Sequence, residues 1–120
     1  MDADELKQRT KKFALRIIKL VESLPKTKTG DVIGRQLLRC GTSVGANYRS
    51  ACRAPSKADF ISKTGIAIEE ADETIYWMEL LIEGNLISQP MSEQLLKEAN
   101  EVTAILTASV ITARKNLQKT

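Results

Sequence analysis

The chain has 120 residues, of which 42% are hydrophobic and 28% charged, and its formal net charge is +3. These values are ordinary for a folded globular protein, so they exclude a disordered or fibrous chain, and the length suits one domain with a substantial core. We therefore expect a single domain over residues 1–120.

The sequence contains no run of eighteen apolar residues, and residues 1–5 are acidic where a secretion signal would be basic and then apolar. A cytoplasmic protein with no membrane partner is therefore expected.

The first predicted helix spans residues 4–24, where apolar side chains recur at helical spacing. Its buried stripe comprises Leu6, Phe13, Ile17, Leu20, Val21 and Leu24. Residues 25–30 contain proline, glycine and polar residues, which indicates a loop, and Thr29 or Asp31 is the expected cap of the helix that follows.

The second predicted helix spans residues 32–53. Its apolar stripe comprises Ile33, Leu37, Cys40, Val44, Tyr48 and Ala51. Three internal glycines, Gly34, Gly41 and Gly45, each cost up to about 1 kcal/mol relative to alanine. They indicate either close approach of a neighbouring helix or a kink.

The two cysteines, Cys40 and Cys52, both fall on this second helix. Twelve residues of helix separate them by about 18 Å, too far for a disulfide. We interpret them as small buried side chains, with a redox or intermolecular role as the alternative.

Two further helices complete the chain. Ser56 is the expected cap of the third, which ends at residues 84–85, and Ser92 is the expected cap of the fourth, after Pro90. The inner stripe of the third helix comprises Phe60, Thr64, Ala67, Ile68, Ala71, Ile75, Met78 and Ile82. That of the fourth comprises Leu95, Ala99, Val102, Leu106, Ser109, Val110, Ala113 and Leu117. Four helices joined by short loops predict an all-α, antiparallel up-down four-helix bundle.

A second apolar surface is predicted on the outer sides of the third and fourth helices, and it indicates self-association. Its residues are Ile66, Trp77, Leu80, Leu81, Ala104, Ala108 and Ile111. A bundle core broad enough to include some of these side chains is the alternative.

Charge is distributed unevenly along the chain. Residues 1–57 carry a net charge of +8 and residues 58–120 carry −5. Basic side chains form one stripe on each of the first two helices, and these stripes are candidate contacts for a phosphate backbone. They comprise Arg9, Lys12, Arg16, Lys19, Arg35, Arg39, Arg49 and Arg53. The alternatives are that these basic side chains only face solvent, or that they pair with acidic faces of other helices or subunits.

The sequence offers no recognisable catalytic site. The chain has no histidine to activate a serine or cysteine, and the acidic cluster at 69–79 lies on a single helix, whereas metal sites in bundles draw ligands from several helices. We therefore expect no enzymatic activity, no metal and no cofactor.

Residues 42–49 (TSVGANYR), 66–74 (IAIEEADET) and 76–81 (YWMELL) resemble the four-helix-bundle family known from intervening sequences of bacterial 23S ribosomal RNA. That family is similar to the accessory variability determinant of diversity-generating retroelements. The resemblance implies a homopentamer and suggests RNA or DNA, and a reverse transcriptase or another protein, as partners. Where many relatives have an acidic residue after Asn-Tyr-Arg, this chain has Ser50 and Cys52.

The family signature residues in this chain are Asn47, Arg49, Arg53, Asp59, Lys63, Glu69, Glu73 and Trp77. They can be interpreted as polar bridges between helices or subunits, or as ligand contacts. The sequence thus predicts a non-enzymatic, homo-oligomeric, nucleic-acid-binding accessory factor. A protein-binding scaffold is the alternative, and an RNA-processing enzyme would need cleavage without histidine.

Overall fold

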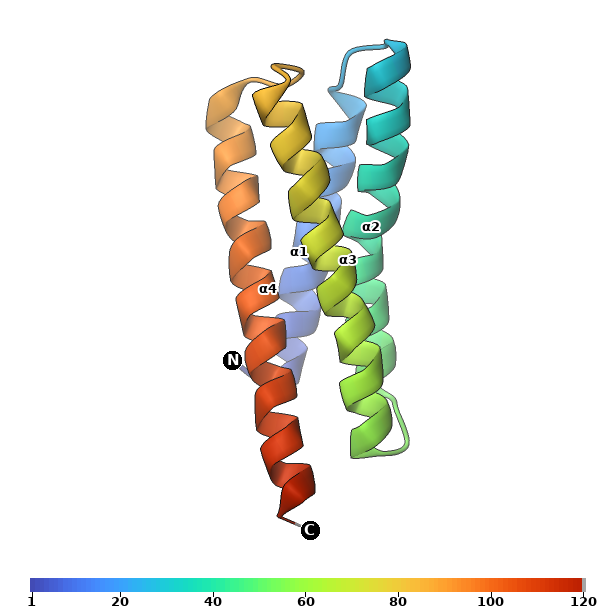
Figure 1. The fold of residues 1–120 in the computed structure, drawn as a ribbon, viewed down its shortest axis with the longest axis vertical. Coiled ribbons are helices and arrows are strands. Elements are labelled where there is room, and N and C mark those ends of the chain that lie inside the picture. Colours follow the sequence, from blue (N-terminus) through green and yellow to red (C-terminus); the bar gives the residue numbers. More distant parts are fainter. Residues whose placement is uncertain (120) are drawn as a thin grey trace.

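The computed structural model describes residues 1–119, apart from the side chain of Gln89, and shows four long helices packed side by side (Figure 1). They are α1 (Ala3–Glu22), α2 (Lys28–Cys52), α3 (Lys57–Glu83) and α4 (Gln89–Gln118). Each helix runs antiparallel to the one before it, and the C-terminal end of α4 projects beyond the N-terminus of α1 (Figure 1). The predicted all-α up-down bundle is confirmed.

Side-chain caps begin the first three helices. Asp2, Thr27 and Ser56 each accept a hydrogen bond from the backbone N–H three residues later, which satisfies a donor that the helix leaves unpaired. The prediction of Ser56 is confirmed. The prediction of Thr29 or Asp31 for α2 is wrong, because the helix begins one turn earlier.

The start of α4 also differs from the prediction. Ser88 is the N-cap, and Pro90 lies within the first turn rather than before the helix. Proline is tolerated there because its missing N–H would have no helical partner. Ser92 is consequently not a cap, and its buried hydroxyl donates to the carbonyl of Ser88 at 2.9 Å.

The core follows the predicted stripes closely, except that Leu117, near the C-terminal end of α4, is 43% exposed, so its predicted place in the inner stripe is wrong. Phe13, Ile17, Leu37, Met78 and Leu106 are among its largest fully buried side chains. Helix α3 packs extensively against both α2 and α4, whereas α1 and α4 touch least. One side of the bundle is therefore packed less tightly than the others.

The glycines of α2 are explained by the close approach of α1. A Cβ on Gly41 would lie 2.8 Å from Cγ2 of Ile17, and one on Gly45 would lie 3.2 Å from Oγ1 of Thr10. Helix α2 is continuous through both positions. The predicted close approach is confirmed, and no irregular segment interrupts α2 at these glycines.

Helix α3 buries a wider arc than predicted because it contacts a helix on each side. Leu81 is 0% exposed and belongs to the core, so its predicted place on the outer surface is wrong. Trp77 is half-buried and packs against the same core. The broad-core alternative therefore accounts for these two side chains.

Across residues 1–119, none of the helices is both long enough and apolar enough to cross a membrane.

Candidate nucleic-acid interface

Arg9 is held in an ion pair between α1 and α4. Its guanidinium donates to Glu98 through Nε at 2.9 Å and through Nη2 at 2.7 Å, and Nη2 also contacts Glu101 at 2.7 Å. This pairing raises the pKa of Arg9, and the hydrogen bonds from Arg9 lower the pKa of Glu98. The positive charge of Arg9 is thus largely matched within the bundle.

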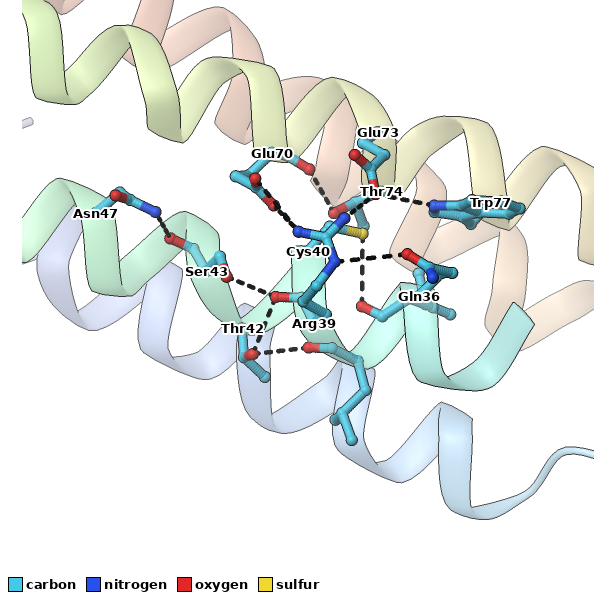
Figure 2. A network of polar contacts seen from close by, with 12 residues as sticks. Gln36, Arg39, Cys40, Thr42, Ser43, Asn47, Glu70, Glu73, Thr74 and Trp77 are labelled. Carbon is cyan, nitrogen blue, oxygen red and sulfur yellow. Dashed lines mark hydrogen bonds and ion pairs between the residues drawn. The ribbon is translucent and has the colours of Figure 1, made fainter. Parts of the chain in front are cut away.

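Arg39 is paired in a comparable way between α2 and α3 (Figure 2). Its Nη1 lies 3.1 Å from Glu70, and its Nη2 contacts Glu73. Glu73 also accepts a hydrogen bond from the indole Nε1 of Trp77 at 3.1 Å. The network joins the two helices, and hydrogen bonding to Glu73 raises the pKa of Arg39.

Four other predicted cations, Lys12, Arg16, Lys19 and Arg35, do not line the groove that holds the last two. Arg16 is close enough to Glu98 to help lower the pKa of that carboxyl. Arg35 lines a shallow groove of about 250 Å³ to which Glu22 and Asp31 also contribute. Lys12 and Lys19 are exposed on α1.

The last two predicted cations, Arg49 and Arg53, converge with two residues that the sequence reasoning missed. Together with Lys7 and Lys11 they line a groove of about 420 Å³ between α1 and α2. The other lining residues are Gln8, Thr10, Ala14, Thr42, Gly45 and Ala46. We call this the basic groove. No carboxylate is among its lining residues, although Asp4 lies 3.7 Å from the ammonium of Lys7 in an exposed pair.

The shape of the basic groove follows from the small residues at its floor. Gly45 lets the backbones of α1 and α2 come together, and Ala14 and Ala46 leave the space above them open. The longer cationic side chains rise from both helices around this floor. An anion placed in the groove would meet positive charge from two sides, which strengthens attraction to a phosphate group.

Lys7 and Lys11 were missed because each helix was considered alone. They lie on the side of α1 that faces α2, away from the stripe that contains Arg9. A signal was present in the spacing, because Lys7, Lys11 and Ala14 form a row at steps of four and three residues, and Arg49 and Arg53 form a similar pair on α2.

The outer surface of α3 and α4 is partly apolar. Ile66, Leu80 and Ile111 are 43%, 37% and 48% exposed, and Ala104 and Ala108 are also exposed. Tyr76, which the prediction did not include, is 55% exposed. Five of the seven predicted interface residues therefore lie on the surface.

Two signature residues, Lys63 and Glu73, bridge α2 and α3. Lys63 donates to the hydroxyl of Ser50 at 3.2 Å, and Glu73 belongs to the Arg39 network. Asn47 instead donates to the carbonyl of Ser43 within α2, and Asp59 lies in the first turn of α3, where its carboxylate contacts Ser56. The interpretation as bridges between helices therefore holds for Lys63 and Glu73, whereas the contacts of Asn47 and Asp59 are local to one helix.

Both cysteines are free thiols in the structure. Cys40 is buried, and this burial raises its pKa, which disfavours the nucleophilic thiolate. Among the described residues, no group of three cysteine, aspartate or glutamate side chains is arranged to hold a metal ion.

Comparison with known proteins identifies similar chains. The family model described as 23S rRNA-intervening sequence protein matches residues 4–108. A crystal structure of a protein of unknown function from the S23 ribosomal protein family of Bacteroides thetaiotaomicron is 40% identical, with a TM-score of 0.82 over 88% of this chain and 97% of that one. None of the curated proteins that were compared matches the chain.

Proposed function

Since the chain belongs to the 23S rRNA-intervening sequence protein family, we propose that it is a cytoplasmic, non-enzymatic, homo-oligomeric accessory protein that binds nucleic acid. The observation that carries this proposal is the basic groove, where Lys7, Lys11, Arg49 and Arg53 converge and no carboxylate contributes to the lining.

The chemistry of the basic groove suits phosphate better than bases. Two of its cations are arginines, whose planar guanidinium groups can form paired hydrogen bonds with phosphate oxygens, and two are lysines, which act as point charges. No aromatic side chain on which a base could stack is among the residues that line the groove. Affinity should therefore be mainly electrostatic and largely independent of base sequence.

Binding to labelled structured RNA and to duplex DNA, at low and at moderate salt, tests this proposal. We expect tighter binding at low salt, and a weakening when Lys7→Gln and Lys11→Gln are combined. The matched control combines Lys97→Gln and Lys115→Gln, which removes the same charge from exposed positions on α4. Equal weakening by both pairs, or absence of binding at low salt, would contradict the proposal.

Self-association is the second part of the proposal, and the exposed apolar side chains of α3 and α4 support it. Ile66, Leu80 and Ile111 are exposed although each is large and apolar. By the sequence resemblance, we propose a pentamer, with a reverse transcriptase or another protein as a further candidate partner. Sedimentation should then detect an oligomer, and the variant Leu80→Glu should shift it towards monomer.

A protein-binding scaffold without a nucleic-acid role remains the second candidate function. The same exposed surface on α3 favours it, together with Gly65, because a Cβ there would meet nothing within 4 Å inside the bundle. A glycine in mid-helix costs about 1 kcal/mol relative to alanine, and no intramolecular contact explains it. If Gly65→Ala left folding intact and weakened self-association, this surface would be a site of close contact between copies of the chain.

A further inference from the structure

The seam between α1 and α2 continues beyond the basic groove and changes character along its length. On α1, one row of residues at steps of three and four positions follows the seam. This row comprises Lys7, Lys11, Ala14, Ile18 and Val21. The facing row of α2 comprises Arg53, Arg49, Thr42, Leu38 and Arg35. The row on α1 is basic at one end and apolar at the other, whereas the row on α2 is basic at both ends, with Leu38 next to Arg35.

The register of the two helices brings the apolar residues together. Gly41 lies against Ile17, and α2 runs antiparallel to α1, so Leu38 comes level with the turn of α1 that follows Ile17. Val21 and Leu38 line the same shallow groove, whose lining also includes Glu22, Lys26, Asp31 and Arg35. Ile18 is not part of that lining and lies three residues before Val21 in the row on α1. We call Ile18, Val21 and Leu38 the apolar patch. Ile18 is 39% exposed and Leu38 is 38% exposed, so a ligand could reach both side chains.

We propose that this seam binds an unpaired strand of nucleic acid, with phosphates in the basic groove and a base of the same strand against the apolar patch. The inference rests on the proposed nucleic-acid role and narrows it to unpaired segments. In a duplex, the bases are stacked inside and mainly sugar and phosphate face outward. A duplex could therefore use the cations but not the apolar patch.

The length of the seam between α1 and α2 suits a short segment of a nucleic-acid strand. Eleven residues of α1 separate Lys7 from Ile18, which corresponds to about 16 Å at 1.5 Å per residue. With a rise of about 3.4 Å per nucleotide, as along one strand of B-DNA, the seam would accommodate about five nucleotides. Phosphates near the two lysines and a base near the patch can thus belong to one continuous segment.

The test compares three labelled probes on the full-length protein. They are a short single-stranded RNA, the same strand annealed to its complement, and the same strand with abasic units in its middle. We expect the single strand to bind about three- to tenfold more tightly than either of the others, as burial of one base against aliphatic side chains would give. All three affinities should decline as the salt concentration rises.

The double variant Ile18→Ala/Leu38→Ala should remove this preference. Its affinity for the intact single strand should decline to that for the abasic strand, and its affinity for the duplex should stay unchanged. The matched control is Val32→Ala/Met91→Ala, which shortens two exposed apolar side chains elsewhere on the surface. The control should keep the preference, and thermal unfolding should show both double variants to be folded.

The outcomes separate this inference from the proposed function. Equal binding of the single strand and the duplex would overturn the unpaired-strand inference and leave the basic groove as a phosphate site. Absence of binding to every probe would overturn both. A glutamate-rich amphipathic helical peptide that displaces the single strand, and that itself binds less tightly to Ile18→Ala/Leu38→Ala, would identify the seam as a protein-docking surface and so overturn the inference.

Discussion

Helix α2 packs against its two neighbours by different physical means. Against α3, the polar network of Arg39, Glu70, Glu73 and Trp77 closes the outer edge of the seam (Figure 2). Against α1, glycines bring the backbones close, and the edge opens into a basic groove whose lining contains no carboxylate. The comparison shows that an arginine on one helix can stabilise the fold or remain available for a ligand, depending on the charge of the helix beside it.

The largest expected effect comes from breaking the close approach on the α1 side. The variant Gly41→Val would place its Cβ within 3 Å of two carbons of Ile17, a buried and stiff side chain. Overpacking of this kind lowers the free energy of unfolding by about 2–3 kcal/mol, measurable by denaturant titration.

Gly65→Val is the matched control, because it introduces the same side chain where nothing in the bundle lies within 4 Å of the new Cβ. Its free energy of unfolding should stay within about 0.5 kcal/mol of the wild type. A comparable loss in both variants would mean that helix propensity, rather than packing against α1, determines the effect.

The ion pair between Arg9 and Glu98 joins α1 to α4 and allows the same comparison at that helix contact. Arg9→Met should lower the free energy of unfolding at neutral pH by about 1–2 kcal/mol, because it leaves the mostly buried Glu98 without its main partner. Urea titration of the wild type and of Arg9→Met measures this difference in the free energy of unfolding.

The same pair predicts a pH dependence. Arg9 lowers the pKa of Glu98 in the folded state, so its contribution is complete above the ordinary glutamate pKa of about 4.3 and is lost as the pH falls through the lowered value. The stability difference between wild type and Arg9→Met should therefore narrow in acid. A difference that stayed constant down to strongly acidic pH would show that packing of the arginine stem is responsible.

The smallest effect is expected from Arg39→Met on the α3 side. Arg39 is exposed, so water and salt screen its attraction to Glu70 and Glu73, and the loss of stability should be smaller than that for Arg9→Met. Added salt should reduce the loss further. Thermal unfolding of wild type and Arg39→Met at low and high salt measures the loss of stability and its salt dependence. A loss larger than that for Arg9→Met would contradict the expectation that an exposed arginine stabilises the fold less.

The fold could be predicted from the sequence because the information lies within single helices. The spacing of Leu6, Phe13 and Ile17 defines the buried face of α1, whereas the glycines of α2 left close packing and a kink open until the structure showed α1 against them. Leu81 was misplaced because the width of a buried arc depends on how many neighbours a helix has. The start of α4 was misplaced because proline both ends helices and fits their first turn.

The candidate site was harder to predict because it depends on which faces of different helices meet. A helical wheel groups Arg39 with Arg49 and Arg53, yet Arg39 reaches the carboxylates of α3 while the other two line the basic groove. A wheel drawn for α1 or for α2 alone does not show that Lys7 and Lys11 lie beside Arg49 and Arg53. The structure brings these four residues into one groove. The sequence of one helix does not show which residues of a neighbouring helix will lie beside it.

The most direct test of the central claim is the salt dependence of nucleic-acid binding by two double variants with equal loss of charge. For a single-stranded RNA, the slope of log affinity against log salt should become shallower by about 1.4 in Arg49→Gln/Arg53→Gln, since each lost phosphate contact contributes about 0.7. Arg9→Gln/Arg39→Gln, measured where it is fully folded, should keep the wild-type slope because both arginines are already paired. Equal reductions in the two variants would contradict the claim that pairing within the bundle decides which arginines bind phosphate.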